Sequence, residues 1–184
     1  MNHLATSMVM LGVLLVVAAA DVAAEPDWLV ERQREEAKAI TEVRKLGGTV
    51  SIIPKSPKPI SVNLEYTKVT DQWLEHLKRL DALEHLDLKH TKINGTGLEH
   101  LKSVVYLRRL DLGYTKVDDA GMEHLNGLGQ LRVLDLRNTR VSDAGLQPLK
   151  AITSLRLLDA RNTKVTSEGA KAFRQALPLC KIAY

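Results

Sequence analysis

The sequence predicts an α/β solenoid, in which short parallel strands form one face and helices form the other. Three observations lead to this fold class. A pattern of apolar residues recurs every 24 residues over most of the chain. Within each copy, leucines first alternate as they do in a half-buried strand, for example Leu110 and Leu112. Apolar residues then follow at helical spacing, as at Leu98, Leu101 and Val104, so each copy encodes one strand and one helix.

Residues 1–24 have the pattern of a signal peptide that is removed on export. The apolar run MVMLGVLLVVAAA is too short to span a bilayer comfortably, and small residues follow it at the spacing that signal peptidase requires. Cleavage is expected after Ala24 or after Ala20, which would place the mature chain in the periplasm or outside the cell. The segment lacks Lys and Arg, so an uncleaved membrane anchor stays open as the alternative.

The size, charge and cysteine content of the chain limit its possible functions. The 184 residues suffice for one domain with a hydrophobic core. Residues 1–24 contain one acid, Asp21, and no base, so the formal charge rises from +4 to +5 without them. This modest positive balance favours acidic partners. Cys180 is the single cysteine, so no disulfide can form within the chain, and we expect it to be a small buried residue rather than a nucleophile.

Residues 25–58 are predicted to form an N-terminal cap. Residues 27–46 have the pattern of an amphipathic helix that ends at Gly47 and Gly48. The segment TVSII (49–53) is expected to be an edge strand, and PKSPKP is a turn whose prolines cannot continue a hydrogen-bond ladder. The apolar face of the helix is expected to contain Leu29, Ala37, Ile40 and Val43.

The repeats follow the cap, and each reads L-x-x-L-x-L-x-x-T-x-V before a polar turn and an apolar helix. One strand and one helix cannot bury both apolar faces alone, but stacked copies can. Residues 179–184 repeat the leucine spacing at Leu179, Ile182 and Tyr184, which predicts a closing strand. The five copies are 59–82, which is the most divergent, 83–106, 107–130, 131–154 and 155–178. Side chains expected to cap the helices are Thr70, Asn94, Asp118, Ser142 and Thr166.

With this pattern, the chain resembles the leucine-rich repeat family, in particular the 24-residue subtype with Thr in place of Asn or Cys found in many exported bacterial proteins. The resemblance implies a right-handed solenoid with a parallel sheet on the concave face and helices on the convex face. It also implies non-catalytic protein–protein recognition on the concave sheet. In the family, the Thr position bonds buried backbone in the turn after the strand, and a hydroxyl can serve there. Its members in this chain are Thr67, Thr91, Thr115, Thr139 and Thr163.

One column of equivalent positions lies just after the strands and is the best candidate for partner binding. It holds Tyr66, His90, Tyr114, Asn138 and Asn162, although the chain has only four tyrosines. Aromatic and arginine side chains are favoured binding anchors. We therefore expect Tyr66, His90 and Tyr114 to bind together with Arg109 and Arg137, supported by Asp111 and Asp135. The alternative is that the tyrosines only cover the ends of strands.

A second column forms a basic ridge two residues further on. Like charges in one row cost stability, so the ridge can serve to bind an anionic partner such as an envelope polysaccharide. The alternative is a role in solubility, with Asp71, Asp119 and Asp143 nearby as screening acids. The ridge consists of Lys68, Lys92, Lys116, Arg140 and Lys164.

Two further columns could hold a metal ion or acid–base groups, but the sequence favours neither role. Asn63, Asp87, Asp111, Asp135 and Asp159 form an acidic row on the concave face. Bases two residues away, such as Arg137 for Asp135, favour compensated and solvated acids over a cation site. The second column lies on helices that are roughly 8–10 Å apart, too far for one zinc ion. Its members are His76, His100 and His124.

No catalytic or cofactor-binding motif stands out. The sequence contains no recognisable nucleophile–base–acid arrangement, glycine-rich phosphate loop or Cys/His metal spacing. Export and few aromatics speak against nucleic acid. The sequence therefore predicts an exported, non-enzymatic module without metal or cofactor that binds an unidentified protein, with membrane contact only if residues 1–24 stay attached.

Overall fold

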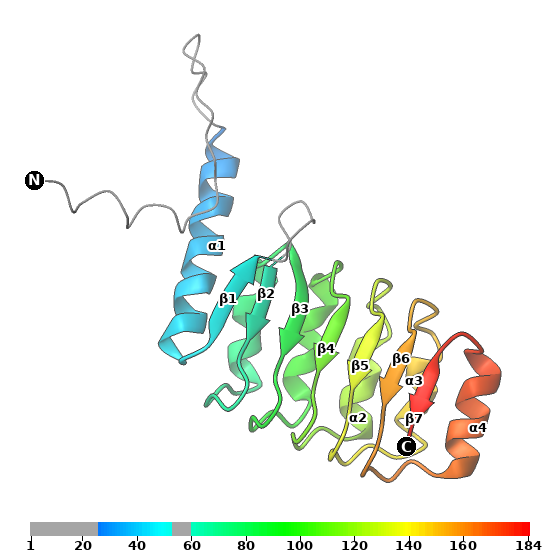
Figure 1. Ribbon diagram of the computed structural model, residues 1–184. Helices are drawn as coiled ribbons and strands as arrows, with labels where there is room; N and C mark the ends of the chain where they lie inside the picture. Colours follow the sequence, from blue (N-terminus) through cyan, green and yellow to red (C-terminus); the bar gives the residue numbers. More distant parts are fainter. Residues whose placement is uncertain (1–25, 53–59) are drawn as a thin grey trace, which may run out of the picture.

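The computed structural model describes residues 26–52 and 60–184, which form one row of strands backed by helices (Figure 1). The segment 1–24 and the turn PKSPKP lie outside the described residues. Seven strands form one sheet in chain order. They are β1 (Thr49–Ile52), β2 (Ile60–Asn63), β3 (Leu83–Asp87), β4 (Arg109–Asp111), β5 (Val133–Asp135), β6 (Leu157–Asp159) and β7 (Lys181–Ala183).

The sheet is parallel from β2 to β7, as predicted, and β1 pairs antiparallel with β2. From β3 onward the strands pair in the register that the 24-residue period sets, so Leu110 lies opposite Leu86 on one side and Leu134 on the other. This register places equivalent residues of successive repeats beside one another, about 4.8 Å apart. Each position of the repeat therefore becomes a straight column on the surface or in the core.

Short helices cover the other face of the sheet, and several are 3₁₀ helices. The predicted spacing of i, i+3 and i+6 explains this, because a 3₁₀ helix has three residues per turn and aligns such residues on one side. Leu98, Leu101 and Val104 are all buried in this way. The elements are η1 (Gln72–Arg79), η2 (Thr96–Ser103), α2 (Asp119–Met122), η3 (Glu123–Leu125), α3 (Leu146–Leu149) and α4 (Ser167–Ala176).

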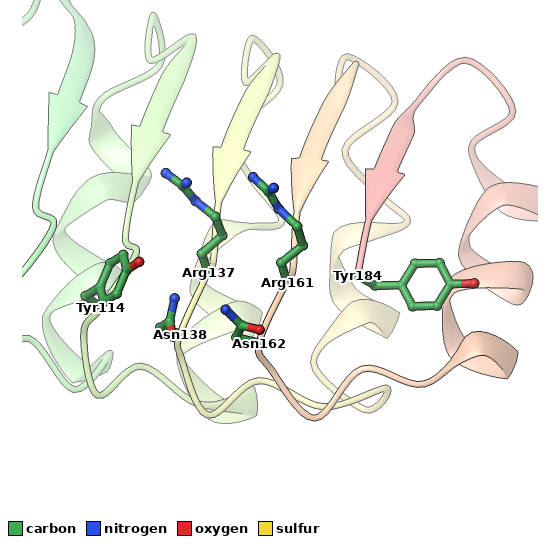
Figure 2. A pocket seen from close by; sticks show the side chains of 6 residues that line it. All are labelled: Tyr114, Arg137, Asn138, Arg161, Asn162 and Tyr184. Atoms are coloured by element: carbon green, nitrogen blue, oxygen red, sulfur yellow. The ribbon is translucent and has the colours of Figure 1, made fainter.

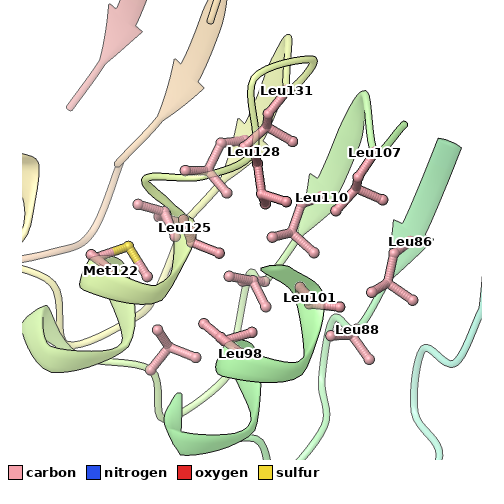
Figure 3. Close-up of a cluster of buried hydrophobic side chains, with 14 of the residues drawn as sticks. Leu86, Leu88, Leu98, Leu101, Leu107, Leu110, Met122, Leu125, Leu128 and Leu131 are labelled. Carbon is pink, nitrogen blue, oxygen red and sulfur yellow. The ribbon is translucent and has the colours of Figure 1, made fainter. Parts of the chain in front are cut away.

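The hydrophobic core runs unbroken through the repeats between sheet and helices (Figure 3). Leu110 from β4 and Leu125 from η3 are both fully buried, and the same columns are filled in the neighbouring repeats. Burying one leucine contributes about 1.5–3 kcal/mol, so packing accounts for stability in a chain without disulfides. Within the described residues, no helix is both long and apolar enough to cross a membrane.

The N-terminal end of the stack is covered by α1 (Asp27–Lys45), and Gly47, with a φ of 83°, turns the chain away just after the helix. The predicted helical face is correct for Val43, which is buried, but wrong for Ala37, which is exposed. Ala39 is buried instead, because it lies one helical turn before Val43 on the side that meets the core. Exposed ion pairs join α1 to η1 and the following turn: Arg32–Asp81 at 2.8 Å and Glu35–Arg79 at 3.0 Å.

The C-terminal end of the stack consists of α4 and β7, and here the predicted place of Leu179 in the core is wrong. Leu179 is 74% exposed, whereas Cys180 is buried. The Cys180 N–H donates to the Leu177 carbonyl, as the Leu155 N–H donates to Ile152 one repeat earlier. Cys180 thus takes the core position after a shift of one residue, which follows the longer helix α4. Burial raises the pKa of its thiol to about 11, in keeping with a buried residue rather than a nucleophile.

Candidate functional site

The column of five residues just after the strands, here called the rim column, has an unusual backbone. Its members are the only described non-glycine residues with positive φ. Each of the first four donates its backbone N–H to the repeat that follows, as from Tyr114 to the Arg137 carbonyl at 2.7 Å. These bonds keep the column in register. The φ angles are 59° for Tyr66, 55° for His90, 60° for Tyr114, 54° for Asn138 and 56° for Asn162.

The first three members of the rim column stack their rings and form what we call the aromatic stack. The ring centroids of Tyr66 and His90 are 4.4 Å apart with an angle of 12° between the planes, and those of His90 and Tyr114 are 4.2 Å apart at 16°. Tyr66 is 71% exposed and Tyr114 is 46% exposed. The structure therefore stacks three residues that the sequence placed in one column into one flat, accessible aromatic surface.

Threonines beneath the rim column hold its turn in shape, in the role that the family resemblance implies. The Thr115 hydroxyl donates to the Leu112 carbonyl at 2.7 Å and accepts from the Val117 N–H at 3.5 Å. The same donated bond, of 2.6–2.7 Å, occurs in every repeat. A turn closed in this way fixes the direction in which each rim side chain projects.

The acidic row on the sheet is compensated by neighbouring bases, as predicted. Arg137 holds Asp135 through Nη2 at 2.6 Å, and its Nε lies 3.4 Å from Asp159 in the next repeat. In the repeat before, Arg109 pairs with Asp111 at 2.9 Å, because the position that Arg137 fills is there occupied by Gly113. The side-chain hydrogen bonds that Arg137 donates to Asp135 raise the pKa of Arg137.

The prediction that these acids are solvated is wrong for the middle of the row. Asp111 is 4% exposed and Asp135 is 6% exposed. The reason is that the arginines lie over them while neighbouring strands flank them. At the end of the row, the hydrogen bond that Arg161 donates holds the pKa of Asp159 below its ordinary value. Among the described residues, no group of three His, Cys, Asp or Glu side chains is arranged to hold a metal ion.

The structure brings most of the predicted binding residues together but separates Arg109 from them. Arg137 directly precedes Asn138 and lies at the rim. Arg109 begins β4, five residues before Tyr114, so it is near the opposite end of the strand. The predicted patch therefore divides into the aromatic stack with Arg137 at the rim, and a paired Arg109–Asp111 group further up the sheet.

Next to the aromatic stack lies a shallow hollow of about 390 Å³ (Figure 2). Tyr114 bounds it on one side, Asn138 and Asn162 lie level with that ring, and the arginine side chains extend up the strands (Figure 2). The Tyr184 ring points away from the hollow, and the Arg174 guanidinium lies 5.2 Å from its centroid. The full lining is Tyr114, Arg137, Asn138, Arg161, Asn162 and Tyr184.

The basic ridge lies two residues beyond the rim column, and its five side chains are all exposed. None of them makes a salt bridge with a residue that the structure describes. Backbone bonds between repeats align the last three members, as from the Arg140 N–H to the Val117 carbonyl at 2.9 Å. The ridge is therefore a row of unneutralised positive charge parallel to the rim column.

Three aspartates that the sequence suggested as screening acids have a structural role instead, and we call them the bridging aspartates. The carboxylate of Asp119 accepts the backbone N–H groups of Ser142 at 2.7 Å and Gly145 at 3.1 Å, and the Ser142 hydroxyl at 2.6 Å. A Cβ at Gly145 would lie 2.5 Å from Asp119 Oδ1, which explains the glycine there. Asp71 and Asp143 bond the repeats that follow them in the same way.

These bridges correct the prediction that each helix is capped by its own polar residue. Only Thr166 accepts a bond as the N-cap residue of its helix, from the Gly169 N–H. Asn94 accepts from the N–H and the hydroxyl of Thr96, Ser142 accepts from the Ala144 N–H, and Asp118 makes no capping bond. The equivalent of a bridging aspartate is missing at Gly95, where φ is 114° and an added Cβ would lie 3.0 Å from the Gly121 Cα.

Comparison with known proteins agrees with this geometry. The family described as "Leucine Rich repeat" matches residues 83–102, 105–125 and 131–150. The matched residues are three leucine-rich repeats, and the chain has the fold of a leucine-rich repeat solenoid. The repeats continue beyond the matched residues, because Thr67 and Thr163 make the same turn-closing bond in the first and last copies. No curated relative matches the chain by sequence.

The solved structures that match the chain include two internalins and a leucine-rich repeat protein. An internalin of Listeria monocytogenes shares 24% identity over 63% of this chain and 32% of its own, with a TM-score of 0.53. A second internalin of that organism has 22% identity over 59% and 46%, with a TM-score of 0.47. A leucine-rich repeat protein of Leptospira interrogans has 16% identity over 60% and 33%, with a TM-score of 0.47. The chain thus spans less than half the length of each structure.

Proposed function

We propose that this leucine-rich repeat protein is a non-catalytic recognition module that binds a protein partner at the rim of its concave sheet. The observation that carries the proposal is the aromatic stack of Tyr66, His90 and Tyr114, in which both tyrosines are exposed and His90 is half-buried. Arg137 adds hydrogen-bond donors beside it, with Asp135 holding it in place, and Arg109 with Asp111 extends the surface up the sheet.

The backbone of the rim column supports a binding role for the tyrosines. The left-handed conformation costs an ordinary residue about 1–2 kcal/mol, and asparagine tolerates it better than most. Asn138 and Asn162 show that asparagine meets the needs of the fold at this position. Tyr66 and Tyr114 therefore bring strain and exposed aromatic area that the fold does not require, which is typical of sites that bind.

The test compares partner capture by the wild type with that by a Tyr66→Asn, Tyr114→Asn variant. Asparagine suits the left-handed backbone, so the variant should fold. We expect a protein retained from extracts of the source cells by the wild type to be lost by the double variant. Tyr106→Ala is the matched control, because Tyr106 is also exposed (57%) but lies outside the rim column. Equal retention by all three proteins would contradict the proposal.

Export is the second part of the proposal, and it rests on the apolar and small residues of the segment 1–24. Expression of the full chain with a C-terminal tag tests it. We expect a periplasmic or extracellular product whose N-terminus is residue 25 or 21. A product that keeps residues 1–24 and sediments with membranes would favour the anchored alternative, and a cytoplasmic product would contradict export.

A second candidate function is the binding of an anionic polymer through the basic ridge. The exposed, unpaired bases favour it, because they can neutralise a row of acidic groups. Titration with an acidic polysaccharide at two salt concentrations separates the candidates. Binding that weakens strongly with salt and is lost in a Lys92→Glu, Lys116→Glu variant would support the ridge, whereas a salt-insensitive complex lost with the tyrosines would support the rim.

A further inference from the structure

The aromatic stack ends abruptly, and the hollow lies where it ends. One ring per repeat, with centroids 4.2–4.4 Å apart, carries the stack from Tyr66 to Tyr114. The next member of the rim column is Asn138, whose short amide cannot cover the outer face of the Tyr114 ring. The hollow of about 390 Å³ begins at that face (Figure 2). A flat ring placed there would continue the stack by one more layer.

The polar groups around the hollow suit the edge of such a ring. Asn138 and Asn162 lie level with Tyr114, so their amides can meet donors or acceptors on the rim of a bound ring (Figure 2). The side chain of Arg137 borders the hollow with its guanidinium held by Asp135, and Arg161 is held by Asp159 at 2.6 Å in the same way. These two arginines line the hollow in fixed positions, and their charges are already paired with carboxylates of the chain.

The free charge near the hollow comes from the basic ridge. Arg140 and Lys164 are each two residues beyond the asparagines, both are exposed, and neither makes a salt bridge with a described residue. Since Asp135 and Asp159 are already matched by Arg137 and Arg161, the ridge leaves net positive charge on this side of the hollow. A group that binds in the hollow is therefore favoured if a negative charge accompanies its ring.

We infer that the hollow takes an aromatic side chain of the partner protein, carried within a residue or two of an Asp or Glu. The ring stacks on Tyr114, and the carboxylate meets Arg140 or Lys164. Aromatic pairs of this geometry stabilise beyond simple burial, and an ion pair at the edge adds direction. A nucleotide would also combine ring and anion, but the sequence offers no glycine-rich loop for its phosphate. This inference rests on the proposed function and names the partner's chemistry.

The test uses the full chain and a displayed library of random 12-residue peptides. We expect the wild type to enrich peptides that pair an aromatic residue with a nearby Asp or Glu. In Asn138→Tyr the chain's own ring should fill the hollow, and the column accepts tyrosine because Tyr66 and Tyr114 have nearly the same φ. Affinity for the enriched peptides should fall at least about tenfold in Asn138→Tyr and in Tyr114→Asn, as for a buried anchor. Tyr106→Ala should bind like the wild type.

The other results would overturn the inference. Enriched peptides that bind Asn138→Tyr as well as the wild type, yet are lost with Tyr66→Asn and Tyr114→Asn together, would leave the rim as the binding surface and reject the hollow. Peptides without an acidic residue would reject the charge pairing. No peptide enrichment, with oligosaccharides or AMP bound by the wild type and not by Asn138→Tyr, would assign the hollow to another ligand class. Circular dichroism establishes that each variant is folded.

Discussion

The rim column keeps one backbone along its whole length but carries different side chains in its two halves. Its φ angles are 55–60° at the aromatic residues and 54–56° at Asn138 and Asn162. In the first half the side chains form a continuous stack, and in the second half they leave a hollow. The repeat therefore determines the backbone of this column, whereas the side chain at each position can vary to suit binding.

The largest expected effect comes from breaking the core that both halves share. Leu134→Arg would bury an unpaired charge at a fully buried position, and even Leu→Ala at such sites costs about 2–5 kcal/mol. We expect the whole stack to unfold, including the aromatic half, because the core runs through both. Leu157→Arg is the control, since Leu157 is 42% exposed. A folded, soluble Leu134→Arg protein in circular dichroism and thermal melts would contradict the register.

A smaller loss is expected from cutting one bridge between repeats. Asp119→Ala leaves the N–H groups of Ser142 and Gly145 without their acceptor, which should lower the free energy of unfolding by about 1–3 kcal/mol. Asp118→Ala is a matched control one residue away, because that carboxylate makes no capping bond, and it should cost less than about 0.5 kcal/mol. Urea denaturation measures both, and equal losses would disprove the bridging role.

Placing the asparagine of the second half of the rim column at a tyrosine position of the first half should change the free energy of unfolding little. Tyr114→Asn removes one ring contact, worth about 0.5–1.5 kcal/mol, but places a better-suited residue on the left-handed backbone. We therefore expect a net change within about 1 kcal/mol in urea denaturation. A loss of several kcal/mol would mean that the tyrosines serve the fold, as the alternative interpretation of this column holds, and would weaken the case for binding.

The smallest effect concerns His85, which lies on β3 opposite Arg109. Partial burial, followed by the positive charge of Arg109, lowers the pKa of this histidine from 6.5. His85 is therefore protonated at a higher pH in the unfolded chain than in the folded one. Protonation favours the unfolded chain, so the free energy of unfolding is independent of His85 well above about pH 6.5 and declines as the pH falls further. His85→Gln should flatten part of this decline in urea denaturation between pH 7.5 and 5.5. An unchanged slope would contradict the assignment.

The parts of the fold that could be predicted from the sequence are those repeated in every copy. The leucines and the threonine of the turn recur at one spacing, and a strand or helix with one apolar face needs a neighbour to cover it. The two errors in the predicted core lie at the ends of the stack, where the period does not apply. Ala37 belongs to a cap helix without repeats, and Leu179 follows the longer helix α4, which shifts the core position to Cys180.

The candidate site could be predicted only in its composition. The sequence indicated that Tyr66, His90 and Tyr114 share a column, but not that their rings stack, since this depends on the left-handed backbone. Asparagine at positions 138 and 162 was the available signal for that backbone. The bridging aspartates were missed because their partners, such as Ser142 for Asp119, lie about one repeat away and are neighbours only in the folded stack.

The missing bridge at Gly95 has a mechanical consequence. The junctions that follow Asp71, Asp119 and Asp143 are each tied by a carboxylate, whereas between Gly95 and Gly121 two backbones rest directly against each other. A carboxylate resists separation through several directed bonds, but such a contact resists only compression. This junction therefore lacks the carboxylate bonds that tie its neighbours, and the backbone bond from the Lys116 N–H to the Ile93 carbonyl at 2.9 Å holds it instead. The stacked rings of His90 and Tyr114 join the same two repeats, so a partner that binds these rings pulls directly on the one of these four junctions that has no carboxylate tie.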